Sequence, residues 1–247
     1  MINKSLSVII PAYNEGANIR RVIGSVSGFL RDNFSDYEIV VVDDGSVDDT
    51  AAVLKGIVAS GTPLTIVTNR PNRGKGYSVK RGVEAASKEY VLMSDADLST
   101  PLKESLKFFD YVAQGFDIVI GSRALPDSRL AVRQGILRRS MGKTFNFILQ
   151  CVLFRGIRDT QCGFKLFKAG QAKELFALLR VERFCFDAEV LFVAKRRGLR
   201  IKEAGVEWAN RQESRVAIVR DSFGMFLDLF MIRLNAWTGA YGSVPGA

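Results

Sequence analysis

Two acidic clusters carry the clearest chemical signal in the sequence, and both follow apolar runs that are typical of β-strands. Asp43 and Asp44 end one run, while Asp95 and Asp97 follow another, with the small Ala96 between them. Crowded carboxylates repel one another, so such clusters indicate a cation or hydrogen-bond donors between them. Alternate aspartates suit Mg²⁺, which takes oxygen ligands and usually keeps waters and substrate phosphates in its shell. An aspartate at a strand end also caps turns, so each cluster has a structural interpretation as well.

The residue types present exclude most other kinds of catalytic site. The 247-residue chain contains no His, which excludes a Ser-His-Asp triad, a Cys-His dyad and a His-bearing zinc site. Its three cysteines, Cys151, Cys162 and Cys185, are too far apart for a CxxC-type metal cluster. An odd and sparse set of cysteines is typical of a reducing compartment. Catalysis must therefore rest on carboxylates, cations and any metal bound through oxygen.

Basic side chains occur in two places where they can meet phosphate. Arg73 and Lys75 lie in residues 72–78, which resemble a phosphate loop but lack its first Gly and the Ser/Thr after the Lys. No GxGxxG motif follows the first strand, so a dinucleotide site is not indicated. Arg73 and Lys75 are either donors to a nucleotide or part of an exposed basic turn. The second set is either a phosphate grip or a solvated helix face, and it comprises Arg123, Arg138, Arg139 and Lys143.

The first half of the chain alternates strand and helix patterns. Strands are predicted at residues 6–11, 38–42, 64–68, 90–93 and 117–121. Helices are predicted at residues 17–30, 51–58 and 75–87, with another that begins at Pro101. Continuous apolar strands alternating with helices indicate an α/β fold with a mostly parallel sheet and helices on both faces. Ligands of such sheets bind beyond the carboxyl ends of the strands, where both acidic clusters lie.

The second half is more basic and ends in an amphipathic helix. Helices are predicted at residues 139–154, 170–179 and 187–197, followed by a strand at 199–206. Because no Pro/Gly/Ser-rich linker separates the halves, we expect a single domain over residues 1–220. The remaining residues, 221–247, are predicted to be a helix and a tail. The apolar stripe of this helix packs either on the core of the chain or on a bilayer surface, and it comprises Phe223, Phe226, Leu227, Phe230, Met231 and Leu234.

Four motifs in order resemble those of family 2 inverting glycosyltransferases with the GT-A fold, a Rossmann-like architecture. They are SVIIPAYNE at residues 7–15, VVDDGSVD at 41–48, NRGKG at 72–76 and DAD at 95–97. Further segments resemble the polyprenyl-phosphate glycosyltransferases, closest to the dolichyl-phosphate β-glucosyltransferase branch. They lie at residues 121–123, 138–140, 159–165 and 186–191. The resemblance implies a nucleotide-sugar-binding half at residues 1–121 and an acceptor-binding half at 122–220.

The resemblance implies roles for the residues that match the donor-binding motifs. Asp97 is expected to ligate Mg²⁺ or Mn²⁺ on the donor diphosphate, with Asp95 near the metal or the ribose. Glu15 is expected to face the ribose, and Asp44, or Asp43 beside it, the base. The residues expected to bind the nucleotide are Pro11, Ala12, Tyr13, Glu15, Asp43, Asp44, Arg73 and Lys75.

The second half is expected to bind the acceptor and the transferred sugar. The resemblance implies that Arg123 and Arg139, with Ser140, grip the acceptor phosphate. Gln161, Asp187 and Glu189 are expected to line the sugar pocket, and Arg215 is expected to reach the donor or acceptor phosphate. Of all these residues, those expected to act on the reacting groups are Asp97, Arg123, Arg139 and Asp187.

The implied reaction is a metal-dependent inverting transfer of a hexose to a polyprenyl phosphate. A phosphomonoester is largely a dianion at neutral pH, so it is already a nucleophile and needs no His. Ser99 stands where polyprenyl-phosphate mannosyltransferases commonly have Gln, which favours UDP-glucose over GDP-mannose. Two alternatives are a GDP-mannose-dependent mannosyltransferase and a transferase that acts on a sugar hydroxyl. The hydroxyl acceptor needs a carboxylate base, for which Asp187 or Glu189 is available.

Net charge indicates an anionic partner and leaves its class open. Lys and Arg number 35 against 26 Asp and Glu, a formal charge of +9. A non-enzymatic module for nucleic acid or membrane explains this surplus but not the acidic strand ends, so we expect no nucleic-acid partner. The amino terminus has no signal-peptide pattern, and no apolar run is long enough to span a bilayer. We therefore expect a cytoplasmic protein that is peripheral at the cytoplasmic face of a membrane.

Overall fold

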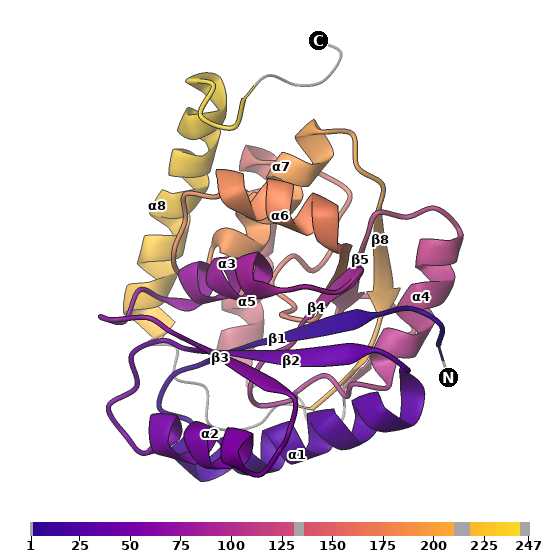
Figure 1. Ribbon diagram of the computed structural model, residues 1–247. Helices are drawn as coiled ribbons and strands as arrows, with labels where there is room; N and C mark the ends of the chain where they lie inside the picture. Colours follow the sequence, from indigo (N-terminus) through magenta and orange to yellow (C-terminus); the bar gives the residue numbers. More distant parts are fainter. Residues whose placement is uncertain (1, 131–135, 210–217, 243–247) are drawn as a thin grey trace.

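The structure is a computed structural model that describes residues 2–130, 136–209 and 218–242, apart from the side chains of 136–141, 143 and 218–223. Within these residues the centre is a seven-stranded sheet of order β3-β2-β1-β4-β7-β5-β8 (Figure 1). β7 runs antiparallel to β4 and β5, and the other neighbours are parallel. The strands are β1 (Leu6–Ala12), β2 (Tyr37–Asp43), β3 (Leu64–Thr68), β4 (Tyr90–Met93), β5 (Ile118–Ser122), β7 (Lys165–Lys168) and β8 (Ile201–Gly205). A separate parallel pair is formed by β6 (Arg129–Leu130) and β9 (Glu207–Trp208).

Helices cover both faces of the sheet. Figure 1 shows α1 and α2 below the sheet, and α3, α6 and α7 above it. The helices are α1 (Gly16–Asn33), α2 (Thr50–Ala59), α3 (Lys75–Ala85), α4 (Glu104–Ala113), α5 (Ile136–Val152), α6 (Ala169–Leu178), α7 (Phe186–Arg196) and α8 (Ile218–Trp237). Successive side chains of a strand point to opposite faces. Val8 and Ile10 therefore pack in the hydrophobic cluster between the sheet and α1. Ile9 packs in the cluster on the opposite face, between the sheet and helices α3 and α7.

The predicted α/β class, with a mostly parallel sheet covered on both faces, is confirmed. β7 was not predicted, because its four residues begin and end with a Lys and lack the apolar pattern of a buried strand. β7 and β8 belong to the second half of the chain, yet they lie in the same sheet as β1–β5. The two halves therefore share one sheet and form one domain.

α8 packs on α5 and α7 through one face only. Leu229, Ile232 and Ala236 are buried on this face. The stripe that was predicted to pack either on the core or on a bilayer is packed on the core in part: Phe226 is half-buried and packs beside Phe145, whereas Leu227, Phe230, Met231 and Leu234 are exposed. The side chain of Phe223 lies outside the described residues. Core packing is therefore the wrong interpretation for these four residues. Among the described residues, no helix combines the length and apolar character needed to cross a bilayer.

Candidate active site

The first part of the candidate site forms where β1 and β2 end side by side. Ala12 lies opposite Asp43 in the sheet register, so the loop after β1 runs beside the loop after β2. The backbone N–H of Asn14 donates to Ser46 Oγ at 2.9 Å, and Val47 N–H donates to Asn14 Oδ1 at 2.9 Å. These bonds hold the two loops together. The edge they form carries four of the residues predicted to bind a nucleotide, which are Pro11, Ala12, Tyr13 and Glu15.

Asp44 ties this edge to the loop that leads into α3. Its carboxylate accepts hydrogen bonds from the backbone N–H of Arg73 at 3.0 Å and of Gly74 at 2.7 Å. Asn69 Nδ2 donates a third bond to it at 2.9 Å. Gly74 has a φ of 103°, a conformation that L side chains rarely adopt. Asp44, predicted to contact a base, thus also fixes the loop that presents Arg73 and Lys75, and Asp43 accepts a bond from Ser46 N–H at 3.0 Å.

Asp95 and Lys75 form an ion pair where β4 ends. Lys75 Nζ lies 2.6 Å from Asp95 Oδ1. Burial alone would raise the pKa of Asp95, but the Lys75 ammonium lowers it below the ordinary aspartate value. Burial by itself lowers the pKa of Lys75, while Asp95 and Asp187 raise it above the ordinary lysine value. Gly163 lies against this carboxylate, since a Cβ there would be 2.4 Å from Asp95 Oδ2.

Asp97 faces the same region but is held differently. Its Oδ1 accepts a hydrogen bond from Ser99 N–H at 2.8 Å, and the residue is exposed. Leu98 between them has a φ of 49°, which bends the chain into a tight turn. Within the described residues Asp97 makes no ion pair. The two aspartates of the motif therefore differ: one is neutralised by a lysine and the other is open to solvent.

Arg123, the residue after β5, makes a bidentate ion pair with Asp159. Arg123 Nε donates to Asp159 Oδ2 at 2.7 Å, and its Nη2 donates to Oδ1 at 2.8 Å. Burial would raise the pKa of Asp159, but the guanidinium lowers it. A guanidinium has five N–H donors, so the clamp fixes its direction and leaves donors for another anion. Arg123 was predicted to grip a phosphate, and Asp159 is the partner that orients it.

Lys165 and Asp187 form a fully buried ion pair between β7 and the first turn of α7. Lys165 is 0% exposed, and its Nζ donates to Asp187 Oδ1 and to the carbonyl oxygen of Cys162. The negative charge of Asp187 is also stabilised by the N-terminus of α7, because the helix dipole favours an anion there. Sequence reasoning assigned a role to Asp187 but none to Lys165. The signal was a Lys inside the apolar run Phe164–Phe167, where an unpaired charge is too unfavourable to bury.

These pairs act on one another as a single electrostatic cluster. Asp95 feels the positive charges of Lys75, Lys165 and Arg123. Lys75 in turn feels Asp95, Asp187 and Asp97. Carboxylates and cations therefore alternate across the carboxyl ends of β4 and β5. Such an arrangement can bind a divalent ion on its acidic side and phosphate oxygens on its basic side.

Residues 7–176 match the family described as glycosyl transferase family 2. The chain belongs to that family. It is 34% identical over 251 residues to the dolichyl-phosphate beta-glucosyltransferase of Dictyostelium discoideum, covering 97% of this chain and 77% of the relative. The Homo sapiens protein of the same name is also 34% identical, covering 96% of this chain and 78% of the relative. Among solved structures, glucosyl-3-phosphoglycerate synthase from Mycobacterium tuberculosis, in complex with Mn²⁺, UDP and glucosyl-3-phosphoglycerate, has a TM-score of 0.68 at 21% identity, covering 93% of this chain and 80% of that one.

The predicted resemblance to family 2 transferases is thus confirmed, and the GT-A fold with it. Not every predicted site residue of this glycosyltransferase lies in the cluster. Gln161 is next to the Arg123–Asp159 pair, since its backbone N–H donates to Asp159 Oδ1 at 3.2 Å. Asp187 is only 2% exposed, so its carboxylate faces Lys165 and not an open sugar pocket.

Glu189 has a different role from the predicted one. Its carboxylate is fully buried and accepts bonds from the backbone N–H groups of Arg180 and Val181 and from the Tyr241 hydroxyl at 2.6 Å. These bonds anchor the α6–α7 loop and the residues after α8. Burial raises the pKa of Glu189 even though these bonds lower it. A sugar-pocket role does not fit this environment.

Three predicted residues of this transferase cannot be placed in the cluster. Arg139 and Ser140 belong to α5, but their side chains lie outside the described residues. Arg215 lies outside the described residues altogether. Their predicted contacts with phosphate stay predictions.

The acidic side of the cluster suits a divalent ion shared with a substrate. Within the described residues, no group of three or more His, Cys, Asp or Glu side chains forms a closed metal cage. Mg²⁺ does not require such a cage, because it is usually held by one or two carboxylates plus substrate phosphates and water. Asp97 is open, and Asp95 already attracts a cation, the Lys75 ammonium. These residues therefore fit a divalent ion that arrives with a diphosphate.

Proposed function

We propose that this family 2 glycosyltransferase transfers glucose from UDP-glucose to a polyprenyl phosphate such as dolichyl phosphate, with Mg²⁺ or Mn²⁺. The observation that carries the proposal is the 34% identity over 97% of the chain to a dolichyl-phosphate beta-glucosyltransferase. The histidine-free cluster of alternating carboxylates and cations supports it, because this chemistry needs charge neutralisation and no general base. Solved relatives of the same fold that were crystallised with Mn²⁺ and UDP add support for the donor class.

The donor is proposed to bind along the β1–β2–β4 edge. The loops after β1 and β2 border the nucleoside, with Glu15 toward the ribose and Asp43 or Asp44 toward the base. Arg73 and Lys75 hold the diphosphate, and Asp97 with Asp95 ligates the metal on it. When bound, the metal stabilises the negative charge that develops on the departing nucleoside diphosphate.

The acceptor phosphate is proposed to approach from the basic side. Asp159 aims the guanidinium of Arg123, which neutralises one charge of the phosphate and orients its attacking oxygen toward the anomeric carbon. Arg139, Ser140 and Arg215 are proposed as further phosphate contacts, and Gln161 as a contact of the sugar. Lys165 holds Asp187 in an ion pair, so this carboxylate is not free to remove a proton. A phosphate dianion has no proton to lose, which agrees with such a site.

Because the proposed acceptor is a lipid, the reaction is also proposed to take place at a membrane surface. We propose that the exposed stripe of α8 rests on the bilayer beside the acceptor. The stripe is apolar, and Trp237, 74% exposed, lies at its end with Arg233 over its ring. An aromatic side chain next to a cation is typical of the membrane interface. The formal charge of +9 favours the anionic cytoplasmic leaflet.

The test incubates the purified protein with polyprenyl phosphate, Mg²⁺ and a panel of nucleotide sugars, and measures organic-phase product by mass. We expect a hexosyl phosphoryl lipid from UDP-glucose, lost on addition of EDTA. A product from GDP-mannose alone would contradict the donor assignment. Parallel reactions with phosphoglyceric acid and with free sugars test the alternative of a hydroxyl acceptor. A product in these reactions alone would overturn the lipid-phosphate assignment.

A further inference from the structure

The open edge of the sheet lies at β3. This strand is the last in the sheet and pairs with β2 alone among the described strands. Its residues are half-buried or exposed along its whole length. An edge strand of this kind presents backbone N–H and C=O groups that have no partner strand.

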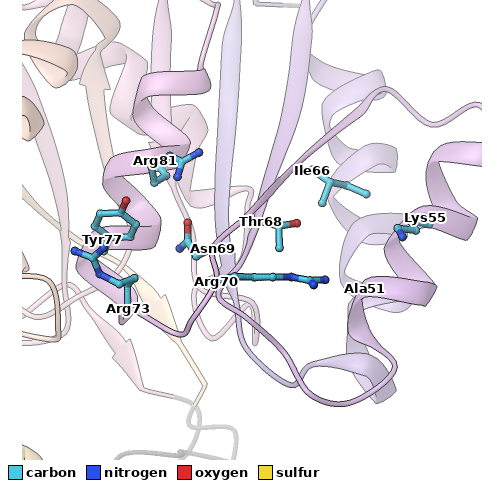
Figure 2. Close-up of a pocket in the computed structure, with 9 residues that line it drawn as sticks. All are labelled: Ala51, Lys55, Ile66, Thr68, Asn69, Arg70, Arg73, Tyr77 and Arg81. Atoms are coloured by element: carbon cyan, nitrogen blue, oxygen red, sulfur yellow. The ribbon is translucent and has the colours of Figure 1, made fainter.

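A basic groove runs along this edge between α2 and α3 (Figure 2). Of its nine lining residues, four are Lys or Arg and none is acidic. Figure 2 shows Lys55 on α2 and Arg70 reaching toward that helix, with Arg73 and Arg81 on the opposite side by α3. The groove, called the β3-edge groove below, is lined by Ala51, Lys55, Ile66, Thr68, Asn69, Arg70, Arg73, Tyr77 and Arg81.

Two of the four cations that line the groove have a partner on the chain, and two have none among the described residues. Arg73 is paired with Glu182 and lies over the Tyr77 ring at 4.1 Å, and both contacts keep it in place. Lys55 and Arg70 are exposed, and within the described residues neither makes an ion pair or a hydrogen bond. Asn69 is 2% exposed, and its Oδ1 has no hydrogen-bond partner among the described residues. The groove therefore offers free cations and a free buried acceptor beside an unpaired strand.

We propose that the β3-edge groove binds an extended acidic segment of a partner protein by strand addition. The backbone of the segment pairs with β3, as in other complexes that extend a sheet at its edge. Side chains of an added strand point alternately to the two sides. Carboxylates on one side meet Lys55 and Arg70. Those on the other side meet Arg81, whose guanidinium also lies 3.7 Å from the exposed Glu84 carboxylate. This site adjoins the proposed donor position through Arg73, which lines the groove, but the cations that it is proposed to use, Lys55, Arg70 and Arg81, have no part in donor or acceptor binding.

The geometry favours a peptide over a lipid surface. The groove is concave and sits between two helices, and none of its lining residues is a large exposed apolar side chain, whereas α8 carries five of the ten such side chains among the described residues. A bilayer meets a protein through such apolar side chains and flanking cations. An added acidic strand needs only a row of unpaired backbone groups and cations beside it, and both are present at β3.

The test uses a short fluorescein-labelled peptide in which glutamate and valine alternate. A peptide with lysine in place of glutamate serves as its control. We expect saturable binding of the acidic peptide by fluorescence anisotropy, and affinity lower by about tenfold or more in Lys55→Glu/Arg70→Glu. The control variant Arg31→Glu/Lys173→Glu makes the same charge change at exposed positions outside the groove and keeps the affinity. Hydrogen exchange of residues 64–68 should slow when the peptide is bound.

Two results would overturn the proposal. Equal affinity of the acidic peptide for the groove variant and for the wild-type chain would show that the peptide does not bind in the groove. If the groove variant lost binding to anionic vesicles while its peptide affinity stayed unchanged, Lys55 and Arg70 would be contacts of a membrane and not of a peptide. Thermal unfolding of both variants shows that each charge change leaves the fold intact.

Discussion

The two aspartates of the DAD motif differ in their partners, and this difference gives each a separate expected phenotype. Asp95 is paired with Lys75, whereas Asp97 is exposed and accepts only a backbone bond from Ser99 among the described residues. Asp97→Asn keeps an oxygen to accept that bond but removes the charge that a divalent ion needs. We expect turnover to fall by about a thousandfold, with little change in thermal stability. Turnover near the wild-type value, or turnover retained in EDTA, would contradict the proposed metal ligand.

Lys75 Nζ lies 2.6 Å from Asp95 Oδ1, so we expect the lysine to compete with a divalent ion for this carboxylate. Lys75→Met frees the carboxylate. We expect Mn²⁺ alone to bind Lys75→Met about tenfold more tightly than it binds the wild-type chain. The affinity for UDP in the presence of Mn²⁺ should fall. Electron paramagnetic resonance of free Mn²⁺ measures the first quantity without turnover. Lys80→Met is the matched control, because Lys80 lies on the same helix and donates to the Ala177 carbonyl. Equal Mn²⁺ affinities in Lys75→Met and wild type would contradict the competition.

At the scale of elements, the Lys165–Asp187 pair joins β7 to α7 inside the core. Both side chains are almost fully buried, at 0% and 3% exposure. Asp187→Ala leaves Lys165 as an uncompensated buried charge, so we expect a loss of about 3–5 kcal/mol of unfolding free energy in urea titrations. Lys165→Met/Asp187→Leu removes both charges and should recover most of that loss. A single variant as stable as wild type would show that the pair is not needed for stability.

α8 separates a buried face from an exposed apolar one, and only the second is proposed to meet the membrane. Phe230→Ser/Trp237→Ser removes two aromatic side chains that are 59% and 74% exposed. Binding to anionic vesicles in a flotation assay should weaken by about tenfold or more, because each ring contributes over about 1 kcal/mol when buried in the interface. Val47→Ser changes a side chain that is 85% exposed at another site and should bind as wild type does. Equal flotation of all three proteins would contradict the assignment.

For the whole molecule, the sequence predicted what is local and missed what depends on distant partners. The apolar runs at β1 to β5 and the acidic residues after them could be predicted, because each strand and its following turn are continuous in sequence. β7 could not, since its place between β4 and β5 depends on residues far along the chain. The partners of Asp187 and Arg123, which are Lys165 and Asp159, likewise come from other segments. Glu189 matched a family motif, but its contact with Tyr241 lies 52 residues away and no local pattern indicates it.

The balance of charges over the whole fold predicts its response to acid. Four aspartates, Asp48, Asp95, Asp117 and Asp159, have pKa values below the ordinary value, because hydrogen bonds or neighbouring cations outweigh their burial. A lowered pKa contributes stability that is complete above the unfolded-state value of about 4 and is lost as the pH falls through the folded-state value. We therefore expect the unfolding free energy from urea titrations to decline steeply between about pH 5 and pH 2.

Two variants test the sign of this dependence. Asp159→Asn removes one such carboxylate, so its slope in the acid range should be smaller by up to about 1.4 kcal/mol per pH unit, the value for one proton. The contribution of Glu189 to the pH dependence of stability has the opposite sign, because burial raises the pKa of this carboxyl. The stability that it contributes is lost as the pH rises through the raised value. Glu189→Gln should therefore alter the pH dependence above the ordinary glutamate value and not the steep acid decline. An Asp159→Asn slope equal to that of the wild-type chain would show that this carboxylate takes up no proton on acid unfolding, against the lowered pKa set by Arg123.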